Sequence, residues 1–195
     1  MINFIFTGQP SRPAPAGRCK LHGAIRDQYA AKTVTASADS VGAVQVLVVH
    51  VATMRCGFVL DDVIEVLPAL EMAALPGAPE VIGGVIDLRG ALVPVLDLRR
   101  RLGLPGRPPH VDDHVVVCHV GARSVAIWVD RAADVLTIAR RDLEPLDDVA
   151  QAGYLPGVTR RDDGLMLVYD VRSFLAADEA LRLDTALSSA ARSHP

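Results

Sequence analysis

The sequence predicts a mainly β protein built from small barrels, with a single helix at its C-terminal end. Half of the 195 residues are hydrophobic, and most of these are valine, leucine and alanine; valine favours the pleated surface of a strand. Apolar runs of strand length follow one another closely, separated by Gly, Pro and Asp residues, which is typical of small barrels. Only residues 171–187 have a helical spacing of apolar side chains over a useful length.

Composition excludes several classes of protein. A net charge of −3 and an aromatic content of 4% give neither the basic surface nor the stacking rings of a nucleic-acid-binding protein. The charge-free stretch 40–54 is too short and too polar to cross or insert into a membrane, and no signal peptide is expected. Three widely spaced cysteines (Cys19, Cys56 and Cys118), with no CxxC pair, indicate a reduced, cytoplasmic protein.

The chain divides into three parts. Residues 1–42, which include QPSRPAPAG, show no persistent period and predict a poorly ordered N-terminal extension. Residues 43–187 carry the strand and helix patterns of a folded domain, and residues 188–195 are expected to form a disordered tail.

Strands are expected wherever the apolar runs occur. The run at 44–51 (VQVLVVHV) predicts a strand buried on both faces, paired in a hairpin with 55–60. Pro94 predicts that its strand is an edge strand or bulged there, and Gly83-Gly84 predict a bulge or a close backbone approach. The other expected strands are 63–67, the two halves of 81–98, 115–120 with 124–129 as a hairpin, 135–138 and 165–169.

The expected helix at 171–187 would begin after a capping Asp170. Its apolar face would contain Val171, Phe174, Leu175, Leu181 and Leu187. A short helical turn is also expected to end at 99–101.

No catalytic or cofactor motif is present, neither a phosphate-binding glycine loop nor a nucleophile elbow. Several potential metal ligands do lie close in sequence. Cys118 and His119 are adjacent in a predicted strand, however, so their side chains point to opposite faces, and a buried thiol with surface imidazoles is the favoured interpretation. The Asp pairs are best explained as turn residues. The potential ligands are His110, His114, Cys118 and His119, with Cys56 or His50 as additions.

The link Asp87-Leu88-Arg89-Gly90 joins two strongly apolar strands. One interpretation is a reverse turn with a local ion pair between Asp87 and Arg89, which would add little stability. The other is an arginine presented at the rim of a barrel for a carboxylate of a partner protein, because the guanidinium fork can bind a carboxylate bidentately.

These residues carry a resemblance to the CheW family of chemotaxis adaptor proteins. The family pattern Pro-x-x-hydrophobic-x-Gly, then Asn-Leu-Arg-Gly, then hydrophobic-Pro-hydrophobic-hydrophobic-Asp-Leu-Arg is similar to 79–84, 87–90 and 93–99. The elements 63–66 (VIEV), 129–136 and 157–170 resemble further family segments, so the resemblance extends from about Val44 to Ala177.

The resemblance implies two five-stranded SH3-like barrels side by side, with a hydrophobic groove between them and a C-terminal helix. It also implies a non-enzymatic scaffold without cofactor or metal, whose partners are the regulatory domain of the histidine kinase CheA and the cytoplasmic tips of methyl-accepting chemoreceptors. Arg89 would be the surface arginine needed for coupling. Glu65, with Val63 and Val66 beside it, would lie at the receptor-facing surface, and Gly84 would permit a close backbone approach.

One departure from the family pattern leads to a second hypothesis. Asp87 stands where the family usually has Asn, and an acid two residues before Arg89 could pair with it and compete with a partner's carboxylate. The chain would then be a divergent adaptor of another chemosensory pathway, such as surface motility. A third hypothesis, from a different class, is a small metal-dependent enzyme that uses residues 110–119.

Overall fold

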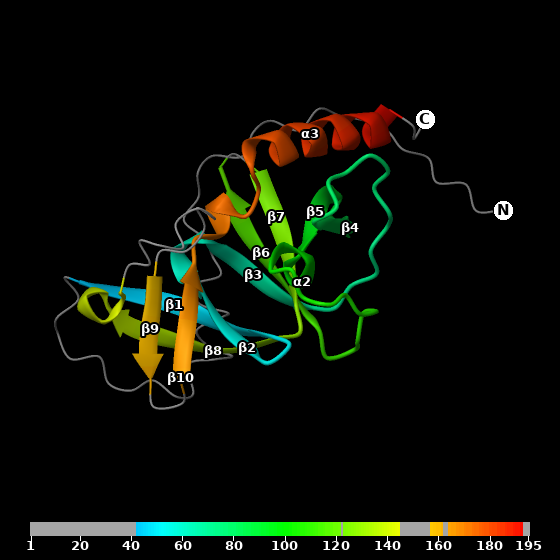
Figure 1. The fold of residues 1–195 in the computed structure, drawn as a ribbon. Helices are drawn as coiled ribbons and strands as arrows, with labels where there is room; N and C mark the ends of the chain where they lie inside the picture. The colour runs from blue at the N-terminus through cyan, green and yellow to red at the C-terminus, as the bar shows by residue number, and fades with distance from the viewer. Residues whose placement is uncertain (1–41, 122, 145–156, 162–163, 193–195) are drawn as a thin grey trace.

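In a computed structural model, which describes residues 42–121, 123–144, 157–161 and 164–192, the chain forms two five-stranded sheets and one long C-terminal helix (Figure 1). The first sheet has the strand order β8-β1-β2-β10-β9, and the second has the order β3-β6-β7-β5-β4. The predicted fold class is therefore confirmed. The first sheet contains β1 Ala43–Val51, β2 Met54–Val59, β8 Arg131–Ala139, β9 Gly157–Arg161 and β10 Gly164–Tyr169. The second contains β3 Val63–Pro68, β4 Ile82–Leu88, β5 Ala91–Asp97, β6 His114–Val120 and β7 Arg123–Val129.

The hairpins expected from the apolar runs are present. β1 pairs antiparallel with β2 and carries four consecutive buried residues, 46–49, as expected of a strand covered on both faces. β6 and β7 form the second expected hairpin. Each sheet also contains one parallel pair, β2 with β10 and β5 with β7, which brings together segments far apart in the sequence.

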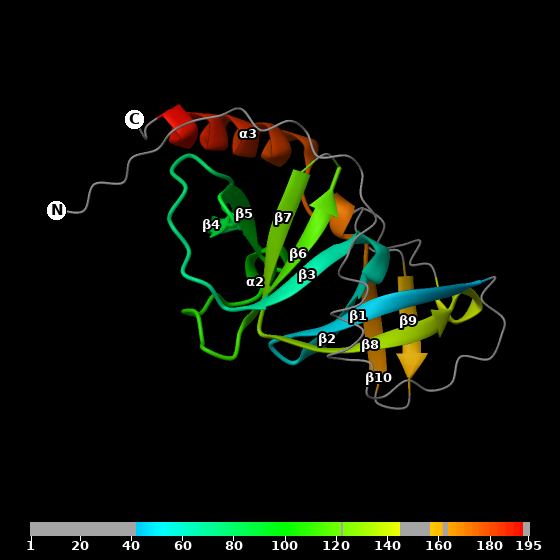
Figure 2. The ribbon, with the colours of Figure 1, turned by 180° about the vertical axis from the view of Figure 1, so that it is seen from behind.

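The described residues form three apolar clusters. Each sheet encloses a small cluster of its own, as expected for a small barrel. The largest cluster lies between the sheets and contains Leu47 and Phe58 from the first, Val116 and Ile127 from the second, and Phe174 from the C-terminal segment. The facing sides of the two sheets are thus joined by packed side chains. Figure 2 shows the two sheets next to each other, with α3 beside the second one.

Pro94 lies in an interior strand, so the expectation of an edge strand was wrong. β5 lies between β7 and β4, and the irregularity in register falls between Ile82 and Gly84 on β4 instead. Val85, the partner of Pro94, exchanges both backbone hydrogen bonds with Ala73 on its other side. Pro94 therefore occupies a position that needs no N–H toward β4, and pairing of β5 with β7 begins only at Val95.

The C-terminal helix differs from its prediction. Residues 171–173 form a separate 3₁₀ turn (η5), and Asp170 caps this turn by accepting from the backbone N–H of Arg172. The long helix α3 runs over Ala177–Arg192, and Glu179 accepts from the N–H of Ala176 at its start. Leu183 and Ala186 are buried, whereas Leu181, expected on the apolar face, is 69% exposed. The helix also includes residues 188–192, for which the sequence predicts a disordered tail.

Short helical turns complete the chain at η2 Leu60–Asp62, η3 Arg140–Asp142 and α2 Leu98–Arg101, the last as predicted. Arg101 of α2 donates to the Glu179 carboxylate and to the Phe174 carbonyl, which attaches α3 beside the second sheet. Within the described ranges, no helix is long and apolar enough to span a membrane. The predicted N-terminal extension lies outside the described residues, apart from Gly42.

Candidate functional site

The β4–β5 connection is a two-residue hairpin turn with an arginine at its tip. Leu88 pairs with Ala91, and both intervening residues have left-handed backbones, with φ of 56° at Arg89 and 86° at Gly90. The Asp87 carboxylate accepts the Gly90 N–H at 2.7 Å and so stabilises the turn. Asn-Gly and Asp-Gly are the usual choices for such a turn, and a left-handed arginine costs about 1 kcal/mol or more. Another requirement must therefore favour arginine at this position.

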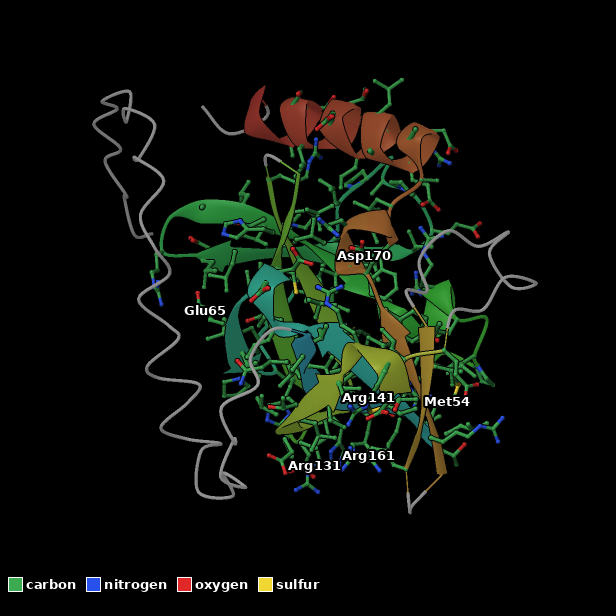
Figure 3. All side chains as sticks on the ribbon, turned by 90° about the vertical axis from the view of Figure 1, so that its left-hand side faces the viewer. Met54, Glu65, Arg131, Arg141, Arg161 and Asp170 are labelled. Atoms are coloured by element: carbon green, nitrogen blue, oxygen red, sulfur yellow. The ribbon has the colours of Figure 1, made fainter. Side chains whose placement is uncertain are left out.

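Arg89 forms an ion pair with a buried acid from another strand. Its Nη2 donates to Oε2 of Glu65 at 2.9 Å. The Glu65 side chain on β3, labelled in Figure 3, comes from a different strand of the same sheet. It is only 6% exposed, whereas the side chain of Arg89 is 76% exposed. A buried carboxylate needs a hydrogen-bonded cation, so Glu65 holds the guanidinium at the protein surface.

One of the two interpretations of the link 87–90, the local ion pair between Asp87 and Arg89, was wrong, and so was the expected surface position of Glu65. Asp87 bonds the turn backbone, and the carboxylate that pairs with Arg89 is Glu65 instead. Glu65 does not lie at the surface, because β3 places its carboxylate beneath the arginine. Val63 is also buried, and Val66 packs partly buried against the apolar cluster between the sheets, so neither adds much to an exposed surface.

The close approach predicted at Gly84 is confirmed. Val85 and Ala73 exchange two backbone hydrogen bonds, which bring the segment around residue 73 against β4 beside the bulge. A Cβ atom built on Gly84 would lie 2.5 Å from the carbonyl oxygen of Ala73. Glycine is therefore required here, whereas the same atom on the adjacent Gly83 would have no neighbour closer than 3.8 Å.

The potential metal ligands do not converge. Among the residues that the structure describes, no group of three or more His, Cys, Asp or Glu side chains could hold a metal ion. Cys118 is buried and lies opposite Val63, while His119 is exposed. Burial raises the pKa of the Cys56 thiol to about 12 and also raises the pKa of the Cys118 thiol.

The two buried thiols should be unreactive in the native protein. In a Cys19→Ser variant, we expect Cys56 and Cys118 to react with a chromogenic disulfide reagent at pH 8 at a small fraction of the rate of a free thiol, roughly a hundredth or less, because the thiolate is the nucleophile. The same reaction in denaturant should be complete within the mixing time. Rapid stoichiometric reaction of the folded protein would contradict this assignment.

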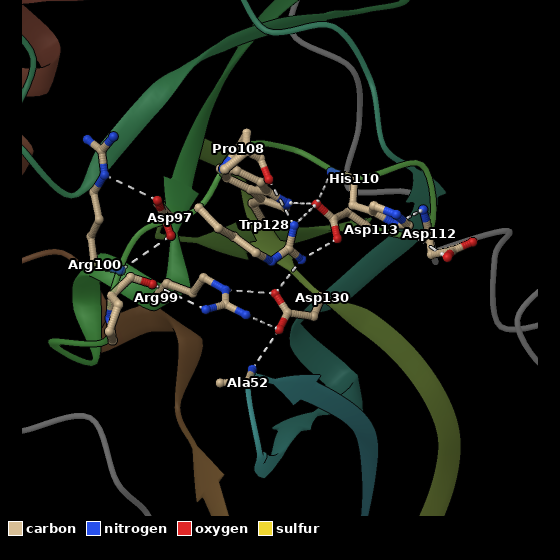
Figure 4. Close-up of polar contacts among 12 residues, drawn as sticks. Ala52, Asp97, Arg99, Arg100, Pro108, His110, Asp112, Asp113, Trp128 and Asp130 are labelled. Carbon is tan, nitrogen blue, oxygen red and sulfur yellow. Dashed lines mark hydrogen bonds and ion pairs between the residues drawn. The ribbon is translucent and has the colours of Figure 1, made fainter.

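A second cluster, at the junction of the two sheets, is not evident from the sequence. It contains two carboxylates, Asp113 and Asp130, and two guanidiniums, Arg99 and Arg107 (Figure 4). Burial disfavours ionisation of both carboxyls, but hydrogen bonds from Arg107 to Asp113 and from Arg99 to Asp130, with further donors, hold the pKa of each below its usual value. The interpretation of the pair Asp112-Asp113 as turn residues is therefore incomplete, because Asp113 also forms an ion pair with Arg107.

This cluster predicts a loss of stability in acid. A carboxyl whose pKa is lower in the folded than in the unfolded state stabilises the fold above the unfolded pKa of about 3.9, and this stabilisation is lost as pH falls through the folded pKa. Asp130→Asn should lower the free energy of unfolding at pH 7 by about 1–3 kcal/mol and flatten its decline between about pH 5 and 3. Urea unfolding over this range measures both effects. Asp112→Asn, at an exposed neighbouring carboxylate, is the control; an unchanged acid profile in Asp130→Asn would refute the assignment.

Comparison with known proteins agrees with this geometry. Residues 45–179 match the family described as CheW-like domain. The chain is 32% identical over 108 residues to a chemotaxis protein CheW of Rhizobium meliloti, covering 54% of this chain and 70% of the relative. It is 28% identical over 122 residues to that of Klebsiella aerogenes, covering 61% and 74%.

A solved structure supports the same assignment. The crystal structure of the scaffolding protein TtCheW from Thermoanaerobacter tengcongensis superposes with a TM-score of 0.64 at 25% identity, covering 70% of this chain and 94% of that one. Fold, family match and relatives agree, and the chain therefore belongs to the CheW-like family of non-catalytic chemotaxis scaffold proteins.

Proposed function

We propose that this protein acts in the cytoplasm as an adaptor that couples methyl-accepting chemoreceptors to the regulatory domain of the histidine kinase CheA. The observation that supports the proposal is the exposed Arg89 held by the buried Glu65 at the tip of the β4–β5 turn. One guanidinium nitrogen donates to Glu65, while the largely exposed side chain has further donors for a carboxylate of a partner. Family membership supports a scaffold role in chemotaxis.

The structure of the turn holds the Arg89 side chain in a fixed orientation at the protein surface. Leu88 and Ala91 close it, Asp87 fixes the backbone of Gly90, and Glu65 limits the freedom of the arginine side chain. An arginine whose orientation is fixed before binding loses less conformational entropy when the partner arrives. Leu92, which pairs with Asp87 across the β4–β5 hairpin, is exposed and adds an apolar side chain to the surface near the turn. A partner segment that combines a carboxylate with an apolar side chain would suit this surface.

The proposal is tested by reconstitution. The purified protein is titrated into a CheA regulatory domain and, separately, into receptor signalling fragments, and binding is measured by calorimetry. We expect dissociation constants of about 1–50 μM, in the range of reversible signalling contacts. Full-length kinase with receptor fragments should then show receptor-dependent autophosphorylation only when the protein is present. Absence of binding to both partners at tens of micromolar would reject the proposal.

The variant Asp87→Asn distinguishes this function from a divergent pathway. The role of Asp87 in the turn needs only a side-chain oxygen that accepts from Gly90, which Asn supplies equally well. Ordinary coupling therefore predicts that Asp87→Asn changes partner affinities by less than about twofold. A change of partner preference would favour an adaptor of another chemosensory pathway.

A further inference from the structure

Asp130 lies where the chain passes from the second sheet to the first. It follows Val129, the last residue of β7, and precedes Arg131, the first of β8. Its backbone N–H donates to the His50 carbonyl at 3.0 Å, and its carboxylate accepts the Ala52 N–H at 2.6 Å, both groups belonging to the β1–β2 hairpin of the first sheet. Ala52 has a left-handed backbone, with φ of 53°, which indicates a tightly constrained turn.

The same carboxylate is also bound from the second sheet. Arg99, in the short helix α2 that follows β5, donates from Nε at 2.9 Å and from Nη2 at 2.5 Å, a bidentate pair. Arg107, from the loop before β6, donates to Asp130 at 2.7 Å. One carboxylate therefore connects the β1–β2 hairpin of the first sheet to α2 and the 103–113 loop of the second (Figure 4).

A second carboxylate fixes Arg107. Asp113, whose side chain is only 1% exposed, accepts from Arg107, from Nε1 of Trp128 at 2.9 Å and from the N–H of His110 at 2.7 Å. The charges thus alternate in the order Asp113, Arg107, Asp130, Arg99, and none of the four side chains is more than 26% exposed. The two carboxylates and the two guanidiniums of this cluster balance in charge, and each hydrogen bond between them has a defined direction.

Directional contacts of this kind matter because of how the two sheets are joined. In the described part of the chain, no strand of one sheet pairs with a strand of the other. The cluster between the sheets is apolar, and apolar burial is strong but non-directional, so it holds the sheets together without fully setting the angle between them. The hydrogen bonds that the Asp130 carboxylate accepts from both the β1–β2 hairpin and α2 can set that angle.

We propose that Asp130 is a positioning residue whose carboxylate fixes the orientation of the first sheet relative to the second. The functional importance of this role rests on the proposed function. An adaptor that contacts a receptor through the Arg89 turn of the second sheet can transmit a conformational change of the receptor to a kinase bound elsewhere only if the two sheets move as one body. Loss of the Asp130 charge would leave both sheets folded but loosen the angle between them.

The structural test measures distances within the molecule. Spin labels are placed in a Cys19→Ser background at exposed positions of different sheets, Leu165→Cys and Leu92→Cys, and in a control pair within the second sheet, Leu92→Cys and His119→Cys. Electron–electron dipolar spectroscopy should show a broadened or shifted distance distribution between the sheets in Asp130→Asn, and an unchanged one within the second sheet. Asp97→Asn, a buried carboxylate that caps α2 inside the second sheet, should change neither distribution.

The functional readout separates this proposal from the previous one. Asp130→Asn should bind kinase domain and receptor fragment separately within about twofold of wild type, yet reduce receptor control of the kinase about fivefold. If the wild type binds neither partner, the proposed function is wrong. The distance distribution between the two sheets still tests the positioning role of Asp130 in that case. If Asp130→Asn does not fold, Arg99→Gln removes the bidentate pair while Arg107 still binds Asp130. A wild-type distance distribution between the sheets in the folded variants would overturn the proposal.

Discussion

Replacing Gly84 with alanine is expected to lower the free energy of unfolding by roughly 2–4 kcal/mol, which would be a large part of the stability of a domain of this size. The added Cβ would lie 2.5 Å from the carbonyl oxygen of Ala73, and that oxygen accepts a hydrogen bond from Val85. Relief of the clash requires movement of backbone that is fixed on both sides. Both hydrogen bonds between Ala73 and Val85 should therefore weaken.

The adjacent residue supplies a matched control. Gly83→Ala places its Cβ no closer than 3.8 Å to a neighbour, so the variant should differ from wild type by less than about 1 kcal/mol. Chemical unfolding followed by circular dichroism measures both variants, and amide exchange at Val85 reports whether its hydrogen bond opens. Equal stability of the two variants would show that the segment around Ala73 can withdraw from β4 without cost.

The strands of this fold were predictable because apolar runs and turn residues are local signals. β1, β2, β6 and β7 were expected within a few residues of their bounds, since short apolar runs rich in β-branched and aromatic residues favour β structure. Sheet order was not predictable in this way. The parallel pairs β2–β10 and β5–β7 join segments that are distant in the sequence, and no local sequence signal predicts that they pair. Pro94 lies in an interior strand because of this sheet order.

The candidate site was predicted in part. The resemblance identified Arg89, and the pattern around Gly83-Gly84 indicated the bulge on β4. The partner of Arg89 could not be read from the sequence, because Glu65 is 24 residues away and the nearby Asp87 offered a simpler pairing. The Asp130 cluster was missed for the same reason, since Arg99 and Asp130 are 31 residues apart. Adjacent arginines at 99–101 resemble a solvated surface, although Arg99 is only 15% exposed.

The Arg89 turn makes a prediction in which stability and function separate. Arg89→Glu should reduce receptor-dependent kinase activation about tenfold or more, because it removes the guanidinium and places a second carboxylate beside Glu65. That variant alone is ambiguous, since repulsion between the two acids could also disturb β3 and β4. A substitution that suits the turn but lacks the charge is therefore required.

Arg89→Asn is that substitution. Asn-Gly is the preferred pair for a turn with two left-handed residues. The stability gained from the more favourable turn backbone should therefore offset part of the stability lost with the Glu65 ion pair. Combining it with Glu65→Gln removes the buried charge that would otherwise lack a partner. The double variant should unfold within about 1 kcal/mol of wild type, yet lose coupling about tenfold. Wild-type coupling by this stable double variant would show that the arginine is retained for the ion pair alone. Loss of coupling at preserved stability would mean that the backbone strain at Arg89 persists because a partner needs the guanidinium at the tip of this turn.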